Sequence, residues 1–177
     1  MNEKVLIAYA SQYGSTQEVA EAIAATLRES NLFVDLQPVK KVKSLAGYGA
    51  IVLGTPVYMG SLHKNMQNFL TLYQEALKQQ SPAIYALGPL SMDEKEWQEC
   101  RAMLDKELAK FPWLSPLAVE MFGGKYNPTR LNLPHKLLTS LPASPLHGMP
   151  AKDLRDWAAI QNWAKSLVMK FQVVLPQ

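Results

Sequence analysis

Short apolar runs alternate with amphipathic segments along most of the chain. Runs that are apolar throughout, such as Ala50–Gly54, are typical of strands covered on both faces of a sheet. Between such runs, apolar residues recur at helical spacing, as in Val19, Ile23 and Leu27. The alternation predicts an α/β fold with a parallel, doubly wound sheet. Its five strands are expected at residues 4–10, 32–39, 50–54, 83–87 and 117–122.

Helices are predicted between and after these strands. Ser15, three residues before Glu18, has the spacing of a capping box at the start of the first helix. One helical stripe runs over residues 66–77, a second over 97–108, and the last helix covers about 153–171.

The stretch from about 124 to 150 departs from this pattern. It holds five of the chain's twelve prolines, and no Asp or Glu occurs between Glu120 and Asp153. Pro134 suits the first turn of a short, leucine-rich helix over residues 133–141. We therefore predict a Pro-rich, basic and apolar insertion within one domain spanning residues 1–177. Such an insertion could dock a quinone, an apolar substrate or a membrane surface, or it could pack on the sheet edge or form a homodimer contact.

Composition narrows the class of protein. The net charge of +3 over 177 residues lacks the footprint of a dedicated nucleic-acid binder. The single Cys100 can form no internal disulfide, and no zinc-ligand spacing is present, so no metal site is expected. The apolar run Val5–Ala10 is too short for a signal peptide or a membrane span. We expect a cytoplasmic protein, with peripheral contact at the inner face of the membrane left open.

The candidate site lies in the loops after the strands, because ligands of doubly wound sheets bind beyond the carboxyl ends of the strands. The first loop combines hydroxyls with consecutive amides at a helix N-terminus, which suits a phosphate monoester without a lysine. Each loop alone could be an ordinary turn or helix cap, but their convergence on one sheet edge favours binding. The three loops comprise Ser11, Gln12, Tyr13, Gly14, Ser15 and Thr16; Thr55, Pro56, Val57, Tyr58, Met59 and Gly60; and Gly88, Pro89 and Leu90.

Other site classes with related folds do not match. The chain has no Walker phosphate loop, and Gly47-Tyr48-Gly49 precedes a strand and lacks the third glycine of a Rossmann turn. A phosphoacceptor receiver needs acidic residues where Ala10-Ser11 and Gly54-Thr55 stand. No G-x-S-x-G follows a strand, which excludes a nucleophile elbow.

The loops resemble those of the flavodoxin superfamily, and in particular the flavodoxin-domain branch that contains menaquinone-dependent protoporphyrinogen dehydrogenase. The S-x-Y-G-S-T run over 11–16 resembles the family's FMN phosphate loop, and Gly60–His63 resembles its second flavin loop. Phe122–Tyr126 and Asp156-Trp157 resemble that branch specifically.

The resemblance implies a five-stranded sheet in the order 2-1-3-4-5 and FMN as the cofactor. It implies that residues 11–16 hold the phosphate and that the loops from Thr55 and Gly88 surround the isoalloxazine, together with Gly123, Gly124 and Tyr126. Either Tyr58 or Tyr126 is expected to flank the ring.

The kind of redox chemistry is less constrained. Low-potential flavodoxins are typically acidic around the flavin, whereas the loops here carry His63, Lys64 and Lys125 and no carboxylate before Asp93. These cations are expected to raise the flavin potential and favour a two-electron or quinone-linked oxidoreductase. Acidic residues after Pro89 stand where the protoporphyrinogen enzyme has basic ones. A passive electron carrier and a structural or sensory FMN domain are the alternatives, and no sequence signal identifies the electron donor.

Overall fold

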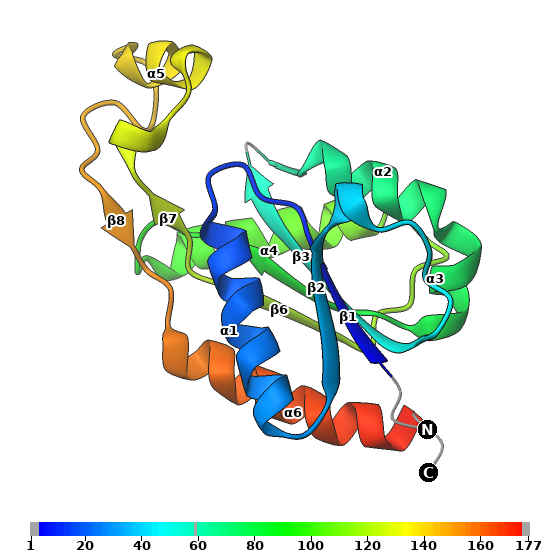
Figure 1. The fold of residues 1–177 in the computed structure, drawn as a ribbon. Coiled ribbons are helices and arrows are strands. Elements are labelled where there is room, and N and C mark those ends of the chain that lie inside the picture. The colour runs from blue at the N-terminus through cyan, green and yellow to red at the C-terminus, as the bar shows by residue number, and fades with distance from the viewer. Residues whose placement is uncertain (1–3, 59, 175–177) are drawn as a thin grey trace.

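The computed structural model describes residues 4–58 and 60–174 and has an α/β architecture built on one parallel sheet (Figure 1). The sheet runs in the order β2-β1-β3-β5-β6, and every neighbouring pair in this order is parallel. Counted along the chain, these strands have the predicted order 2-1-3-4-5, so the predicted fold class is confirmed. Their bounds are Lys4–Tyr9 (β1), Phe33–Pro38 (β2), Tyr48–Tyr58 (β3), Ala83–Leu87 (β5) and Ala118–Phe122 (β6).

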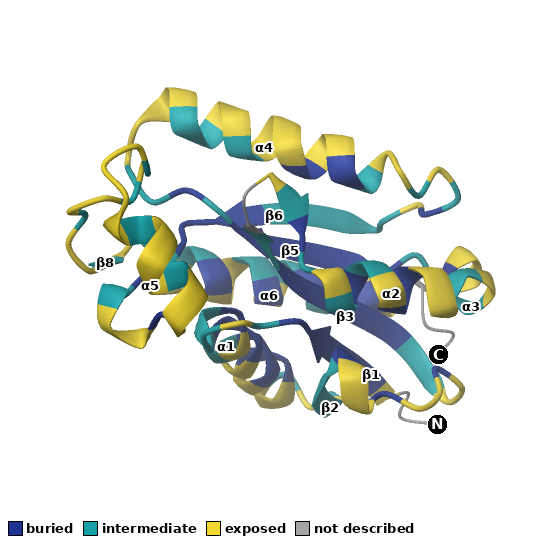
Figure 2. Ribbon diagram, turned by 90° about the horizontal axis from the view of Figure 1, so that it is seen from above, coloured by how far each residue is buried: buried dark blue, intermediate teal, exposed yellow. Residues whose placement is uncertain are grey.

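Helices cover both faces of the sheet, so the central strands β1, β3 and β5 are largely buried, whereas the edge strands β2 and β6 are mostly half-buried (Figure 2). One apolar core lies between the sheet and the helices α1 (Ser15–Glu29) and α6 (Trp157–Val174). A second core, on the opposite face, includes residues from α2 (Lys64–Leu72), α3 (Gln74–Gln80) and α4 (Glu94–Leu108). A short 3-10 turn, η1 (Val39–Lys41), follows β2.

The predicted single helix over residues 66–77 is wrong in one respect, because the structure divides it into α2 and α3 at Tyr73. The Tyr73 hydroxyl donates a hydrogen bond of 2.9 Å to the Val42 carbonyl, and its ring lies 4.8 Å from that of Phe69. Met66 and Leu77, the two ends of the predicted apolar face, are nevertheless both buried in the core.

Strand β3 is longer than the apolar run Ala50–Gly54 that predicted it. Residues Thr55 and Pro56 continue the pairing with β5, and the strand then turns back into β4 (Ser61–Leu62). Pro56 is tolerated because β1 pairs with β3 only as far as Gly54, so the proline lies where one neighbour of the strand has ended. Residues 55–58 are therefore strand residues and not the loop that the sequence suggested.

The insertion stands on a two-stranded antiparallel stem, β7 (Lys125–Tyr126) paired with β8 (Lys152–Asp153). It continues through a 3-10 turn, η2 (Pro128–Arg130), into the helix α5 (Leu133–Ser140). The predicted short helix is confirmed, with Pro134 in its first turn. None of the α5 residues is buried, so the alternative in which this helix packs on the sheet edge is wrong.

Within residues 4–58 and 60–174, no helix has the length and apolar character needed to cross a bilayer.

Candidate functional site

A cleft of about 910 Å³ lies at the carboxyl edge of the sheet, beneath the insertion. Its lining comes from the loops after β1, β3, β5 and β6, from α4 and from the insertion. Of the predicted site residues whose side chains the structure describes, five do not line it, namely Ser11, Gly14, Thr55, Pro89 and Gly123. The residues of that set that do line it are Gln12, Tyr13, Ser15, Thr16, Pro56, Val57, Gly60, Gly88, Leu90, Gly124 and Tyr126.

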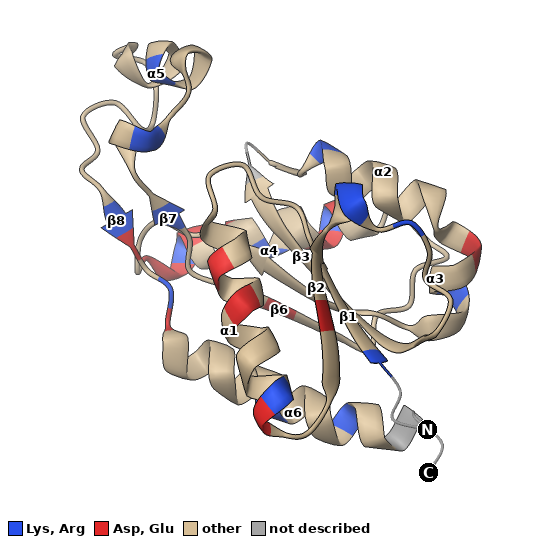
Figure 3. Ribbon diagram, viewed as in Figure 1, with Lys and Arg blue, Asp and Glu red and all other residues tan. Residues whose placement is uncertain are grey.

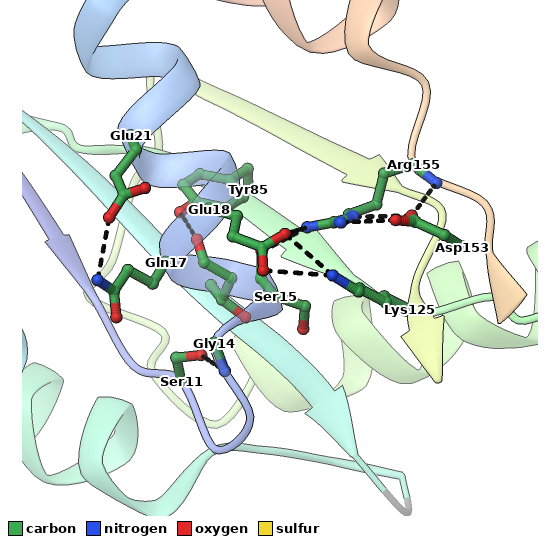
Figure 4. Close-up of polar contacts among 11 residues, drawn as sticks. Ser11, Gly14, Ser15, Gln17, Glu18, Glu21, Tyr85, Lys125, Asp153 and Arg155 are labelled. Atoms are coloured by element: carbon green, nitrogen blue, oxygen red, sulfur yellow. Dashed lines mark hydrogen bonds and ion pairs between the residues drawn. The ribbon is translucent and has the colours of Figure 1, made fainter. Parts of the chain in front are cut away.

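The loop between β1 and α1 is shaped by Gly14, which precedes the first residue of α1 (Figure 4). Its φ of 90° is in the left-handed region, which glycine adopts without steric cost. The Gly14 amide donates a 2.9 Å hydrogen bond to the Ser11 hydroxyl, which holds the loop closed. The predicted capping box is wrong, because Gly14 makes no side-chain cap and the Glu18 carboxylate is bonded elsewhere.

This loop fits a phosphate group on two counts. The first amides of a helix have no intrahelical acceptor, and the first such bond in α1 joins the Glu18 amide to the Gly14 carbonyl. Thr16 borders the cleft, and its hydroxyl is buried without a hydrogen-bond partner among the described residues. Because buried polar groups in proteins are nearly always satisfied, an unpartnered hydroxyl beside free helix amides is what an anion-binding loop leaves for its ligand.

Glu18 connects the phosphate loop to the stem of the insertion (Figure 4). Its carboxylate accepts a 2.6 Å hydrogen bond from Arg155 and a 3.2 Å hydrogen bond from Lys125. Burial raises the pKa of Glu18, but the hydrogen bonds from Arg155 and Lys125 outweigh burial and leave the pKa below its ordinary value. The carboxylate is thus ionised and paired, which limits its repulsion of an anion bound at the adjacent helix N-terminus.

The second loop is shorter than expected because its first residues belong to β3. Thr55 is buried, with 1% of its surface exposed, whereas Pro56, Val57 and Gly60 line the cleft. Gly60 has a φ of 79°, which permits the tight turn between β3 and β4. The side chain of Tyr58 and the whole of Met59 lie outside the described residues.

His63 ends this loop as the cap of α2, where its Nδ1 accepts a 3.1 Å hydrogen bond from the Asn65 amide. Burial, with a further contribution from the positive charge of Lys40, lowers the pKa of His63. Both observations favour the neutral imidazole, so His63 does not supply the positive charge that the sequence suggested.

The loop after β5, at Gly88–Leu90, contacts the segment after β6, at Gly123 and Gly124. The Gly124 amide donates a 2.6 Å hydrogen bond to the Pro89 carbonyl, and a β-carbon at Gly124 would lie 2.9 Å from the Gly88 carbonyl oxygen. Gly123 is packed as tightly, since its β-carbon would lie 2.1 Å from the Leu154 carbonyl oxygen. The absence of a side chain at Gly124 lets its backbone approach that of Gly88, and the same absence at Gly123 lets its backbone approach that of Leu154. Tyr126, which follows in the chain, is 6% exposed and borders the cleft.

Helix α4 contributes a side of the cleft that sequence reasoning missed. Glu96, Glu99, Cys100 and Met103 line it, and they recur at helical spacing along one side of the helix. The Glu96 carboxylate accepts a 2.6 Å hydrogen bond from the Leu90 amide, and it also bonds the Ser91 hydroxyl. The sequence predicted a helix here from its apolar stripe and acidic residues after Pro89, but it did not indicate that this helix borders the cleft.

These carboxylates correct the expected charge of the site. Glu96 and Glu99 line the cleft, Lys125 is paired with Glu18, and His63 favours its neutral form. The expectation that His63, Lys64 and Lys125 give the site a positive character is therefore wrong, because the carboxylates that follow Asp93 in the sequence line the cleft from α4. The positive charge of the flavin loops therefore no longer supports the expected rise of the flavin potential.

The insertion lies against the phosphate loop. The Tyr13 hydroxyl forms a hydrogen bond with Nδ1 of His135 on α5, and the two rings lie 5.8 Å apart, edge to face. Leu138, Leu141 and Leu146 from the insertion line the same cleft as the phosphate loop. Two segments that are 122 positions apart at this contact therefore border one cleft.

The comparisons with known proteins assign the family. Residues 6–150 match the family model of the flavodoxin domain, and the chain belongs to this family. FMN is the cofactor that membership implies, and the unpartnered Thr16 hydroxyl, the free helix amides and the neutral phosphate loop fit it.

Curated relatives and solved structures agree with this assignment. The chain is 34% identical over 89 residues to a protein of Afipia carboxidovorans named NAD(P)H dehydrogenase (quinone), a match covering 38% of this chain and 45% of the relative. A protein of Caulobacter vibrioides with the same name is 33% identical over 88 residues, covering 37% and 44%. The chain thus spans less than half of these relatives.

Among solved structures, flavodoxin 1 of Bacillus cereus has a TM-score of 0.58 at 14% identity, covering 98% of this chain and 99% of that one. The rubredoxin oxygen:oxidoreductase of Desulfovibrio gigas has a TM-score of 0.59 at 17% identity, covering 99% of this chain and 37% of that one. At these identities the similarity concerns the fold.

Proposed function

We propose that this protein is an FMN-dependent oxidoreductase whose electron acceptor is a quinone or another flat, apolar molecule bound in the cleft beneath the insertion. One observation carries the proposal: a single cleft is bordered both by the phosphate loop and by Leu138, Leu141 and Leu146 of the insertion. A site that needed only to retain a flavin would not require this apolar roof.

Residues 11–16 would hold the FMN phosphate through the free amides at the start of α1 and the Thr16 hydroxyl. The end of β3 at Pro56 and Val57 with the turn at Gly60, and the segments Gly88–Leu90 and Gly123–Tyr126, would surround the isoalloxazine. Bound FMN supplies reversible two-electron transfer. The apolar side chains of the insertion would exclude water from the acceptor and orient its flat ring.

Cys100 lines the cleft but is unsuited to nucleophilic chemistry. Burial, followed by the negative charges of Glu96 and Glu99, raises the pKa of its thiol. The protonated thiol is a weak nucleophile, so its role here is to pack beside the bound ligand.

For the electron donor we propose NAD(P)H, because the relatives that share part of this chain are named NAD(P)H dehydrogenase (quinone). In the overall reaction, NAD(P)H and a proton reduce the quinone to the quinol, and NAD(P)⁺ is released. Protoporphyrinogen, suggested by the resemblance to one flavodoxin-domain branch, is less well supported. Glu96 places a carboxylate in the cleft where that branch has basic residues.

An electron carrier without its own substrate is the second candidate. The carboxylates of Glu96 and Glu99 at the cleft favour it, since negative charge beside the flavin disfavours the anionic reduced cofactor, as in low-potential flavodoxins. A carrier would pass electrons to a protein partner and would show no saturable turnover with small quinones.

Steady-state kinetics of the FMN-loaded protein with NADH or NADPH and menadione test the proposal. We expect turnover, and we expect Leu138→Asn to raise the KM for menadione by about 5- to 30-fold while flavin content is unchanged, because a polar group then faces the acceptor. Leu72→Asn is the matched control, since Leu72 is 74% exposed on α2 and does not line the cleft. Full FMN loading without quinone reduction would overturn the proposal in favour of the carrier.

A further inference from the structure

The tip of the insertion exposes apolar side chains that face away from the cleft. Leu133 and Leu137 on α5 are 72% and 62% exposed, and neither lines the cleft that Leu138 borders. Their spacing of four residues places them on one face of the helix, next to the exposed Pro134. We call Leu133, Pro134 and Leu137 the apolar tip. An exposed apolar group of this kind marks an interaction surface when it is not part of a core.

Cations surround the apolar tip without acidic neighbours. Lys136 and Arg130 are exposed, and neither takes part in an ion pair with another described residue. No Asp or Glu occurs between Glu120 and Asp153, and Figure 3 shows α5 with basic but no acidic positions. By contrast, Lys125 and Arg155 at the base of the insertion are neutralised by Glu18 and Asp153. Lys136 therefore places a positive charge without an ion-pair partner among the described residues on the same helix as the apolar tip, whereas Arg130 borders the cleft.

The fold holds this tip away from the body of the protein. Figure 1 shows α5 at the far end of the β7–β8 stem, beyond the edge of the sheet. The stem is fixed to α1 by Arg155, whose side chain is 2% exposed and donates to both Glu18 and Asp153. A flat surface can thus approach the tip without contacting the two helical layers.

We infer that the apolar tip docks on an anionic lipid surface. Exposed leucines combined with nearby cations are the chemistry that interfacial helices use, since the leucines enter the headgroup boundary and the cations attract acidic lipids. A symmetric pair of these tips would bring Lys136 of both copies together, and this repulsion disfavours a second copy of the chain as the occupant. Because only one short helix inserts, the association is weak, reversible and sensitive to salt.

Docking would bring the cleft close to the bilayer, because α5 contributes both the apolar tip and the roof residue Leu138. An apolar acceptor dissolved in the membrane could then enter the cleft without crossing bulk water. This consequence rests on the proposed quinone reaction, whereas the docking itself does not.

Cosedimentation of the full chain with lipid vesicles tests the docking. We expect binding to vesicles containing phosphatidylglycerol, none to vesicles of phosphatidylcholine alone, and loss of binding as salt is raised. The double variant Leu133→Ser/Leu137→Ser should weaken binding by about tenfold or more. Lys136→Glu should weaken it by roughly 5- to 30-fold. Both variants should unfold thermally like the parent, because the altered side chains are exposed.

The matched controls are Leu72→Ser and Lys165→Glu, exposed residues of the same types on α2 and α6, and both should bind vesicles like the parent. The inference is overturned if the parent protein does not prefer anionic vesicles or if the tip variants bind as well as the controls. It is also overturned if sedimentation velocity shows a dimer that the leucine variant abolishes while the parent ignores vesicles. Turnover with menadione in solution, measured on the same variants, reports separately on the proposed quinone reaction.

Discussion

The guanidinium of Arg155 lies 2.6 Å from the carboxylate of Glu18, joining residues 137 positions apart in the chain. Arg155 also donates a 3.3 Å hydrogen bond to the Ser15 carbonyl and a 2.6 Å hydrogen bond to Asp153 (Figure 4). One buried side chain therefore connects the phosphate loop, the first turn of α1 and the stem of the insertion. The geometry of the cleft depends on this connection.

Replacing Arg155 with Met should destabilise the fold by about 1–3 kcal/mol. The change leaves the Asp153 carboxylate without its partner and Glu18 with Lys125 alone. Glu18 and Asp153 are 37% and 41% exposed, so water compensates part of the loss. Urea unfolding of the apoprotein measures the difference. Arg101→Met is the control, because the Arg101–Glu120 pair is exposed and should contribute about 0–1 kcal/mol. Equal effects of the two substitutions would contradict the account of Arg155.

The same network predicts how stability depends on pH. The hydrogen bond from Arg155 lowers the pKa of Asp153, and the bonds from Arg155 and Lys125 leave that of Glu18 lowered despite burial. A lowered carboxyl pKa stabilises the folded state above the ordinary values of 3.8 for Asp and 4.5 for Glu, and this contribution is lost as pH falls below them. The stability difference between the parent and Arg155→Met should therefore be constant above about pH 5.5 and shrink towards pH 3. A difference that grows on acidification would contradict this.

The phosphate loop predicts opposite effects on stability and on cofactor affinity. Thr16→Val removes a buried hydroxyl that has no partner, so the apoprotein should be as stable as the parent or more stable. FMN affinity should fall roughly 10- to 150-fold, since a hydrogen bond to a charged group contributes about 1.5–3 kcal/mol. Fluorescence titration of the apoprotein with FMN, paired with urea unfolding, measures both. Thr26→Val is the control, because Thr26 lies farther along α1 and bonds only the Ala22 carbonyl.

The contact between Tyr13 and His135 predicts the mobility of the insertion. Tyr13→Phe keeps the ring and removes the hydroxyl that bonds His135, so the region around α5 should open more often. Trypsin cleavage after Arg130 and Lys136 should accelerate by about 2- to 10-fold, as expected for loss of a bond of about 0.5–1.5 kcal/mol. Tyr48→Phe is the control. The Tyr48 hydroxyl on β3 donates to Asp35 on β2, and neither residue belongs to the insertion. Identical cleavage rates for the two variants would show that the Tyr13 contact does not hold α5.

Local patterns predicted the sheet and most helices because each apolar run or stripe reports burial at its own position. Ala83–Leu87 is buried at every residue, and α1 follows the apolar stripe that includes Val19, Ile23 and Leu27. These signals depend on neighbours in the chain, so periodicity and loop composition are sufficient to find them.

The rest of the site depends on contacts between distant residues, which composition does not encode. Glu18 had the spacing of a capping residue, but Arg155 binds it instead. The acidic residues after Pro89 were apparent in the sequence, but the bond from the Leu90 amide that holds the Glu96 carboxylate was not. Tyr13 bonds His135, which lies 122 positions further along the chain, so no local pattern indicates this contact.

Identification of the bound cofactor tests the central claim most directly. The purified protein should be yellow, and denaturation should release FMN, because the phosphate loop at Thr16 provides free amides and an unpartnered hydroxyl for one phosphate group. Chromatography of the released flavin distinguishes FMN from FAD, and apoprotein prepared in parallel should regain the colour when FMN is added. Release of FAD, or failure of the folded apoprotein to bind FMN, would contradict the account.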